Sequence, residues 1–248
     1  MTKKEKTQII RKTITSLEKV YQDVEPAEPM PVFEQMLQSI LSLNESPSGT
    51  RKAFELFEVE FVDWNEVRVS AVAEIGRVLK DAGLDPEKAR ILKAALGRLF
   101  VKKNQLSMDF LLNYKEKKAH DFLKAFPGLP RATLNEIMLL SLGHPFFPAT
   151  DKVVKVCHAI NVATEDQDID ELAQLLSDSI PKKLMLKAYY LFCAYADDLK
   201  PEKKSKKTAK KSPAKKPAAK KTAKKAPEKK AASAQKTTKK AAKKNAKK

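Results

Sequence analysis

The stretch 123–142, LKAFPGLPRATLNEIMLLSL, is the part of the sequence that decides the predicted fold. A short helix ends in the turn Phe126-Pro127-Gly128-Leu129-Pro130, and a very apolar helix is predicted over 133–142. A glycine in such a turn lets the backbone approach a ligand closely. Amide groups at the start of the second helix point outwards with the positive end of the helix dipole. The stretch therefore predicts a helix–hairpin–helix that can hold a phosphate, and a plain structural turn is the alternative.

Apolar residues recur at helical spacing on both sides of this turn, so we predict an all-α body. The chain has only 6 glycines among 248 residues, and a sheet protein of this size would need many turns with positive φ. Ser46–Pro47 and Asp85–Pro86 each pair a capping residue with a proline suited to the first helical turn. The predicted helices lie at about 9–21, 33–41, 47–61, 67–79, 86–99, 108–112, 119–125, 133–142, 152–159, 169–176 and 182–195.

The positive charge of the chain is concentrated at one end. The formal net charge is +18, but residues 200–248 hold 22 lysines and two acids, whereas residues 1–199 hold 27 bases and 29 acids. The end segment has no aromatic residue and no Leu, Ile or Val, so it is predicted to be disordered. Its lysines are expected to bind nucleic acid by releasing counterions, among them Lys203, Lys204, Lys206 and Lys207. A solvating or artificial extension is the alternative.

Several classes of protein are excluded by composition. Cys157 and Cys193 are too few for a disulfide framework or a four-cysteine metal site. The three histidines are spaced too irregularly for a metal centre, so neither a metal nor a cofactor is expected. No apolar run is long enough for a signal peptide or a membrane helix. We expect a soluble, reduced, intracellular monomer that binds no membrane.

The order and spacing of several segments resemble a known family over about residues 17–199. The body is similar to the endonuclease III-like branch of the helix–hairpin–helix DNA glycosylase superfamily. The similar segments are Phe33-Glu34, Leu41 to Ser46, Gly83-Leu84 with Lys88-Ala89 and Ile91, Phe126 to Thr133, Gly143-x-Pro145, and Val153 to Cys157. The resemblance implies two helical lobes with a DNA cleft between them, one at about 27–145 and the other formed by 1–26 and 146–199.

The resemblance also implies a set of DNA-binding residues. Its hairpin would contact the DNA backbone through Gly128, Leu129, Arg131 and Thr133, and Lys152 would lie nearby. Asn44 stands where the family has a glutamine that helps fill the gap left by an extruded base. The plain alternatives are that Asn44 is an ordinary helix end and that Arg131 is a solvated helix-start residue.

Two departures from the family pattern concern catalysis. Bifunctional members carry a lysine that forms a Schiff base with the sugar, and Ala132 takes its place here. The family aspartate that assists base excision falls on Thr150 by ungapped counting, and Asp151 follows it. Either residue could instead be an N-cap for the next helix, and one residue could serve both purposes.

Two further departures concern the hairpin and the second lobe. The second hairpin glycine is Pro130, which has no N–H, although Arg131 could replace the lost contact by a charge-assisted bond to phosphate. Many relatives carry a four-cysteine iron–sulfur cluster, whose first cysteine would fall near Asp198. We expect no cluster here, because the segment that follows has no cysteine.

A few other side chains have two possible roles. Phe146 and Phe147 lie in a loop that would face the cleft, where they could stack on an extruded base or fill the space between the lobes. Cys193 stands among apolar residues and is predicted to pack in the core. Trp64 is predicted to begin a helix against the core.

The sequence thus favours a monofunctional DNA glycosylase of base-excision repair, which would act on damaged or bent double-stranded DNA with Asp151 or Thr150 in the catalytic role. The alternative is a non-catalytic, nucleoid-associated relative that binds DNA. A helical scaffold for protein partners fits the lysine-rich end poorly. We expect the protein in a bacterial cytoplasm, associated with the nucleoid, or in a nucleus if the source is eukaryotic.

Deletion of residues 200–248 should weaken binding to duplex DNA by orders of magnitude at moderate salt, because the charge that releases counterions is removed. If about eight lysines contact phosphates, log K of the full chain should fall with a slope of about −7 against log salt. Fluorescence anisotropy over a salt series measures both quantities. An unchanged affinity in the truncated chain would remove this segment from DNA binding.

Overall fold

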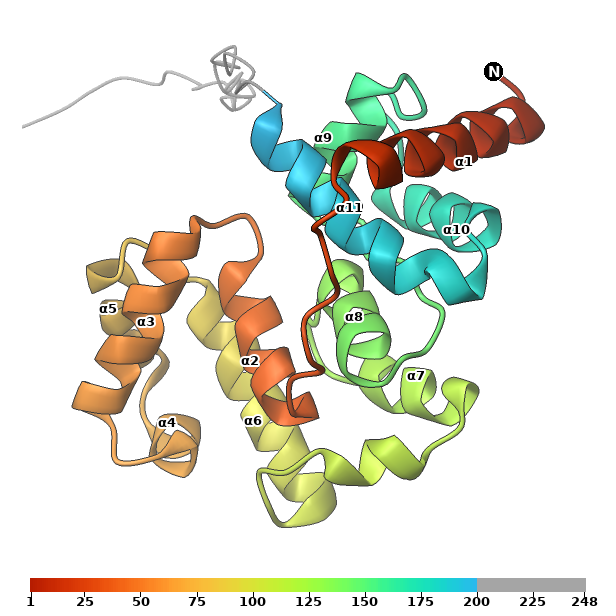
Figure 1. The fold of residues 1–248 in the computed structure, drawn as a ribbon. Coiled ribbons are helices and arrows are strands. Elements are labelled where there is room, and N and C mark those ends of the chain that lie inside the picture. Colours follow the sequence, from red (N-terminus) through yellow and green to blue (C-terminus); the bar gives the residue numbers. More distant parts are fainter. Residues whose placement is uncertain (200–248) are drawn as a thin grey trace, which may run out of the picture. The chain divides into compact units, whose positions relative to one another are not determined.

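A computed structural model of the protein describes residues 1–199. Within this range the regular secondary structure is entirely helical (Figure 1), which confirms the predicted all-α class. The predicted disorder of 200–248 and the predicted DNA contacts of Lys203, Lys204, Lys206 and Lys207 lie outside the described residues.

The helices follow the predicted segments closely. In chain order they are α1 (Lys3–Val20), α2 (Val32–Ser42), α3 (Pro47–Glu60), α4 (Trp64–Val69), α5 (Val72–Asp81), α6 (Lys88–Lys103), the 3₁₀ helix η1 (Asp109–Asn113), α7 (Glu116–Lys124), α8 (Arg131–Glu136), the π-helix η2 (Ile137–Ser141), α9 (Asp151–Ala159), α10 (Ile169–Ser179), the 3₁₀ helix η3 (Lys182–Leu184) and α11 (Met185–Asp198).

Helix α3 begins where the sequence predicts. The Ser46 hydroxyl accepts a hydrogen bond from the Gly49 amide at 3.1 Å, and Pro47 occupies the first helical position. The cap satisfies an amide that has no partner inside the helix, and proline loses nothing there because its missing N–H would be unpaired. This start places the preceding turn, which contains Asn44.

The prediction of one helix over 67–79 is wrong. The chain breaks at Ser70 and Ala71, which are extended, and forms α4 and α5 instead. The Nζ of Lys93 donates to the Arg68 carbonyl at 2.9 Å and also to the Ser70 carbonyl. These bonds satisfy carbonyl groups at the end of α4 that would otherwise lack partners, so the break is stabilised by a lysine on another helix.

The predicted start of α6 is two residues early. Asp85 does accept a hydrogen bond, from the Glu87 amide at 2.9 Å, but regular helix begins only at Lys88. The intervening residues form a turn with i→i+3 bonds, such as Lys88 N to Asp85 O at 3.2 Å. Tight i→i+3 turns are common at helix ends, and this one leads the chain into α6.

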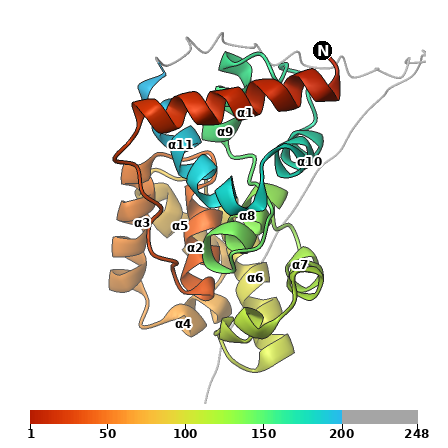
Figure 2. The same cartoon turned by 45° about the vertical axis from the view of Figure 1, so that its right-hand side comes forward.

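The described residues form two hydrophobic cores. The first is built from α2 to α8 together with Ile137 and Met138 of η2, and the second from α1, α9, α10 and α11 together with Leu139. In Figures 1 and 2, α1 lies against α10 and α11, although these helices are far from α1 in the sequence. We call these parts the first and second lobes. The chain passes from one core to the other inside η2.

The two adjacent phenylalanines separate into the two cores. Phe147 is fully buried in the second core and makes edge contacts with Tyr189 and Phe192. Phe146 packs on the first core and stacks on His120, with ring centroids 4.9 Å apart. Of the two roles considered for this pair, the structure supports filling of the space between the lobes.

A buried carboxyl group joins the lobes. Glu136 on α8 is 8% exposed and accepts a hydrogen bond from the Tyr189 hydroxyl on α11 at 2.6 Å. Burial raises the pKa of Glu136 above its ordinary value of 4.5, although the hydrogen bonds from Tyr189 and Ser39 lower it in part. The group is therefore held protonated at a higher pH than a carboxyl group in water.

The variant Glu136→Gln should show this shift as a pH-dependent difference in stability. The unfolded glutamate loses its proton near pH 4.5, whereas the folded one keeps it to higher pH. Protonated Glu136 therefore makes its full contribution to the free energy of unfolding below pH 4.5. That contribution is lost as the pH rises through the pKa of the folded state. In thermal melts from about pH 4 to about pH 8, the melting temperature of the variant should rise progressively relative to that of the wild type. A difference in melting temperature that does not change with pH would contradict the raised pKa of Glu136.

Candidate functional site

The turn between α7 and α8 lies on the surface. Gly128 adopts φ +71°, a conformation that glycine takes without strain and that other residues rarely adopt. Both Gly128 and Pro127 are exposed, and the Leu129 amide donates to the Phe126 carbonyl at 3.4 Å. The turn backbone is therefore accessible to a ligand, as the predicted phosphate contact requires.

The residues that follow the turn differ in accessibility. Pro130 stands at the N-cap of α8 and makes no side-chain cap bond. Arg131 is the first helical residue, and its Nη1 lies 3.6 Å from an Asp170 carboxylate oxygen on α10. Its Nε is enclosed and has no hydrogen-bonding partner. Arg131 is thus directed toward an acid of the second lobe.

The Thr133 side chain is not available to a ligand. It is fully buried, and its hydroxyl donates to the Ser39 carbonyl on α2 at 3.3 Å. A DNA contact through this side chain is therefore contradicted, because a buried hydroxyl that anchors α8 to α2 cannot also reach a phosphate. Ala132, which the sequence resemblance aligns with the family lysine, is partly buried and carries no amine.

Asn44 and Asp151 meet between the two lobes. Asn44 lies in the turn between α2 and α3 with φ 60°, and Asp151 is the first residue of α9. With its amide nitrogen turned toward the carboxylate, Asn44 donates to Asp151 Oδ1 at 2.8 Å and to Oδ2 at 2.6 Å. Hydrogen-bonding partners are the usual basis for orienting an amide. Two residues that are 107 positions apart in the sequence are thus brought together.

The two residues at the start of α9 have different roles. Thr150 is the N-cap by backbone geometry, but its hydroxyl is enclosed and makes no hydrogen bond to the helix or to any other described group. Asp151 is exposed, and its position in the first turn places the carboxylate at the positive end of the helix dipole. Of these two residues, Asp151 is therefore the one that offers an accessible acid.

A buried lysine holds the turn that carries Asn44. Lys88 on α6 is 8% exposed, and its Nζ donates to the carbonyls of Ile40 at 3.1 Å, Leu41 at 3.0 Å and also Leu43. Its Nζ also lies 3.7 Å from a Glu45 carboxylate oxygen. Lys88 thus satisfies the last carbonyl groups of α2, which have no partner within the helix.

The electrostatic surroundings of Lys88 include the candidate acid. Burial lowers the pKa of Lys88, while the charges of Glu45, Asp85 and Asp151 raise it in part. The three protons of an ammonium match its three carbonyl partners. An amine held in this way has no free lone pair to attack a sugar, so the geometry does not make Lys88 a nucleophile.

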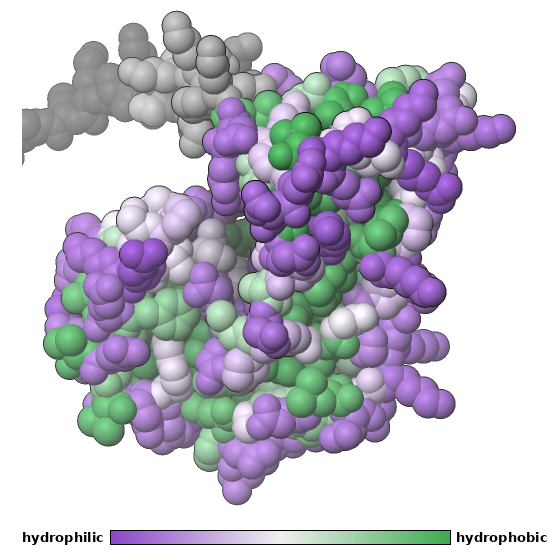
Figure 3. Space-filling view, viewed as in Figure 1, coloured by the Kyte–Doolittle hydropathy of each residue, from purple (hydrophilic) through white to green (hydrophobic). Residues whose placement is uncertain are grey.

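A small pocket opens beside these residues. It has a volume of about 260 Å³ and combines apolar walls with polar groups from Asn44, Glu45, Asp85 and Lys88. Pro130 forms part of its wall, so the pocket lies next to the exposed turn. In the space-filling view of Figure 3 the surface is hollowed between the lobe that carries α3 and α5 and the lobe that carries α11.

Sequence reasoning matched Lys88 to a family segment without giving it a role. The sequence does indicate that Lys88 binds buried groups, because Lys88 lies on the core-facing side of α6 with Ala89, Leu92 and Leu96. A charged residue on such a face needs buried partners. The glutamate and aspartate of the pocket, Glu45 and Asp85, had no comparable signal, because acids beside helix starts are common.

The remaining predicted side chains are accounted for individually. Lys152 is partly exposed, and its Nζ pairs with an Asp197 carboxylate oxygen at 2.7 Å. Trp64 begins α4 and packs on Phe54 and Phe57. Cys193 packs against the second core, where burial raises its pKa to about 11. Within residues 1–199 no group of histidine, cysteine and acidic side chains is placed to hold a metal ion.

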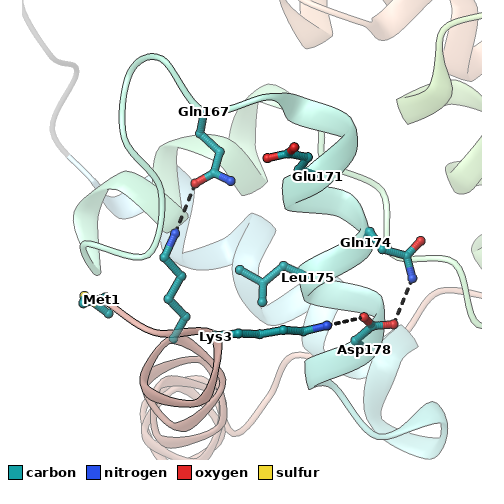
Figure 4. A pocket seen from close by; sticks show the side chains of 8 residues that line it. Met1, Lys3, Gln167, Glu171, Gln174, Leu175 and Asp178 are labelled. Atoms are coloured by element: carbon teal, nitrogen blue, oxygen red, sulfur yellow. Dashed lines mark hydrogen bonds and ion pairs between the residues drawn. The ribbon is translucent and has the colours of Figure 1, made fainter.

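A larger pocket lies elsewhere, between α1 and α10 (Figure 4). Its volume is about 400 Å³, and several of its polar side chains pair with one another. Lys3 pairs with Asp178 at 2.9 Å, and Lys6 donates to Gln167 at 3.2 Å. The pocket contains no residue of the turn or of the Asn44–Asp151 pair. None of the helices over residues 1–199 has the length and apolar character needed to cross a membrane.

Comparisons of sequence give distant relatives of one kind. No protein-family model matches the chain. The candidate DNA glycosylase At3g47830 of Arabidopsis thaliana is 24% identical over 153 residues, which are 62% of this chain and 52% of that protein. The DNA glycosylase/AP lyase ROS1 of Arabidopsis thaliana is 26% identical over 98 residues, which are 40% of this chain and 7% of that protein. The chain therefore spans about half of the first relative and a small part of the second.

Comparisons of structure give the fold directly. A non-covalent endonuclease III–DNA complex matches with a TM-score of 0.60 at 20% identity, covering 79% of this chain and 86% of that one. A Clostridium acetobutylicum 8-oxoguanine glycosylase/lyase bound to double-stranded DNA matches with a TM-score of 0.62 at 16% identity, covering 80% and 71%. The described body therefore has the fold of the helix–hairpin–helix DNA glycosylases, as the sequence resemblance implied.

The variant Lys88→Met should destabilise the protein by about 2–4 kcal/mol, because it leaves the carbonyl groups at the end of α2 buried without donors. Urea unfolding measures this loss. The matched control is Lys80→Met on α5, which removes an exposed lysine and should change stability by no more than about 0.5 kcal/mol. Equal and small effects of both variants would contradict the role given to Lys88.

Proposed function

We propose that this protein is a monofunctional DNA glycosylase of base-excision repair. The observation that carries the proposal is the Asp151 carboxylate, held by Asn44 at 2.8 and 2.6 Å between the two lobes. A pocket of about 260 Å³ next to the exposed turn includes Asn44 in its wall. The shared fold supports the same reading, since the structures that it matches include glycosylases bound to DNA.

The chemistry assigned to Asp151 is electrostatic. Breaking the bond between a base and its sugar leaves positive charge on the sugar, and a nearby carboxylate stabilises that charge. The electron pair of the broken bond leaves with the base. Water then forms the new bond to the sugar carbon, and the proton that water loses passes to the departing base, with Asp151 able to accept it on the way. The bonds of Asn44 would keep the carboxylate in position during these steps.

A covalent route through an amine is not part of the proposal. Ala132 has no nucleophile, and the buried Lys88 ammonium donates to the carbonyls at the end of α2. Schiff-base formation needs a free amine that can reach the sugar. The proposed enzyme therefore releases the base and leaves the DNA strand uncut.

A second candidate function is supported by a different observation. The position of the family aspartate holds Thr150, whose enclosed hydroxyl has no partner. If Asp151 does not take over its role, the protein would bind duplex DNA through the hairpin without excising a base.

The test is a glycosylase assay on duplexes that carry uracil, alkylated purines or oxidised pyrimidines. The wild-type chain should release a free base, and Asp151→Asn should lower the rate by about 100-fold or more, because the carboxylate charge is lost. Asp166→Asn, a change of an exposed acid outside the site, should leave the rate unchanged. Addition of borohydride should trap no covalent adduct.

Three results would count against parts of this proposal. Release of base that survives in Asp151→Asn would remove Asp151 from the reaction. Absence of release from every duplex, with tight binding to DNA, would favour the non-catalytic binder. A borohydride-trapped adduct would mean that another lysine acts as the nucleophile.

A further inference from the structure

Arg98 lies beneath the exposed turn of the hairpin. It is on α6, two helical turns after Ile91, so both side chains are on the same face. A Cβ added at Gly128 would lie 3.8 Å from Cγ1 of Ile91, and the Arg98 guanidinium carbon lies 5.9 Å from the centre of the Phe126 ring. This face of α6 therefore supports the turn, and Arg98 is next to its first residue.

The Arg98 guanidinium has no acid or carbonyl partner among the described residues. Its Nε is enclosed without a hydrogen-bonding partner, and the side chain as a whole is partly buried. Two other arginines of the body are paired with acids, Arg90 with Glu87 at 2.9 Å and Arg77 with Glu60 at 2.7 Å. A buried donor without an acceptor is uncommon in native proteins and calls for an explanation.

The stretch of sequence that carries Arg98 and the turn is positively charged, although the body as a whole is not. Residues 90–131 contain ten lysines and arginines against three acids, whereas the other residues up to 199 contain 17 bases and 26 acids. This stretch runs from α6 through α7 to the turn. A concentration of one sign of charge attracts ligands of the opposite sign, so the net charge of this stretch favours a polyanion.

The usual donors of the hairpin are weakened in this chain. Pro130 has no N–H to offer, and Arg131, the first residue of α8, is directed toward Asp170 at 3.6 Å. A guanidinium can bind two oxygens of one phosphate at once, which an amide cannot do. An unpaired arginine beside the turn can therefore compensate for both losses.

We propose that Arg98 binds a backbone phosphate of duplex DNA next to the one contacted by the turn at Gly128. The proposal rests on the DNA-binding role given above to the hairpin, and it adds a contact from α6, outside the hairpin itself. It requires no base-specific interaction, because phosphate contacts position a protein on DNA without reading sequence.

The test compares variants of the full chain on an undamaged duplex, by fluorescence anisotropy over a salt series. Arg98→Met should lower the affinity by about tenfold and make the slope of log K against log salt shallower by about 0.9. Arg77→Met removes the same charge from an arginine already paired with Glu60, so its slope should equal that of the wild type. Arg98→Lys should retain the slope and recover part of the affinity, because it keeps the charge without the planar fork.

Gly128→Asp separates the failure of Arg98 from the failure of the hairpin. If Gly128→Asp weakens binding and Arg98→Met behaves as Arg77→Met does, the hairpin binds DNA and the Arg98 contact is refuted. If neither variant weakens binding, the hairpin is refuted as well, and the proposed function with it. Thermal melts check folding, and Arg98→Gln replaces Arg98→Met if the latter melts at a lower temperature.

Discussion

The candidate site depends on one buried ammonium group. Lys88 donates to the carbonyls of Ile40, Leu41 and Leu43, and so terminates α2 at a defined place. The turn that follows must then bring Asn44 into a left-handed conformation at φ 60°, from which it reaches Asp151 in the other lobe. A buried charge is tolerated only when it is hydrogen-bonded, and here the same bonds that satisfy the lysine also place the turn.

The contacts between the lobes are polar as well as apolar. Asn44 binds Asp151, Tyr189 donates to Glu136, and Asn135 donates to the Phe147 carbonyl at 3.0 Å. Such bonds require specific geometry, whereas apolar contacts tolerate small shifts. Together they hold the acid of the second lobe beside the turn of the first, which a catalytic carboxylate needs.

The hairpin combines a buried support with an exposed backbone. Behind it, α8 and η2 are mostly buried, and Thr133 anchors α8 to Ser39. In front, Pro127 and Gly128 are exposed. The sequence resemblance aligns Ala132 with a lysine and Pro130 with a glycine. Neither residue offers the amine or the amide N–H expected there, although the support of the turn is intact. This is why the proposed chemistry relies on a carboxylate and the proposed DNA contact on an arginine.

The sequence by itself determined the local features of this protein. The cap at Ser46, the turn at Gly128 and the helical periodicity could be predicted because the residues responsible are neighbours in the chain. The identity of the accessible acid, Asp151, was left between two residues. Backbone propensities act over a few positions, so they were visible without the structure.

Only the tertiary structure decided which groups from distant segments of the chain form hydrogen bonds and ion pairs with one another. The break at Ser70 depends on Lys93, the end of α2 on Lys88, and the position of Asp151 on Asn44, all from segments distant in the sequence. The burial of Thr133 and the pairing of Arg131 with Asp170 likewise follow from packing. Hydrogen bonds and ion pairs act at contact distance, and contacts between distant segments exist only after the chain has folded.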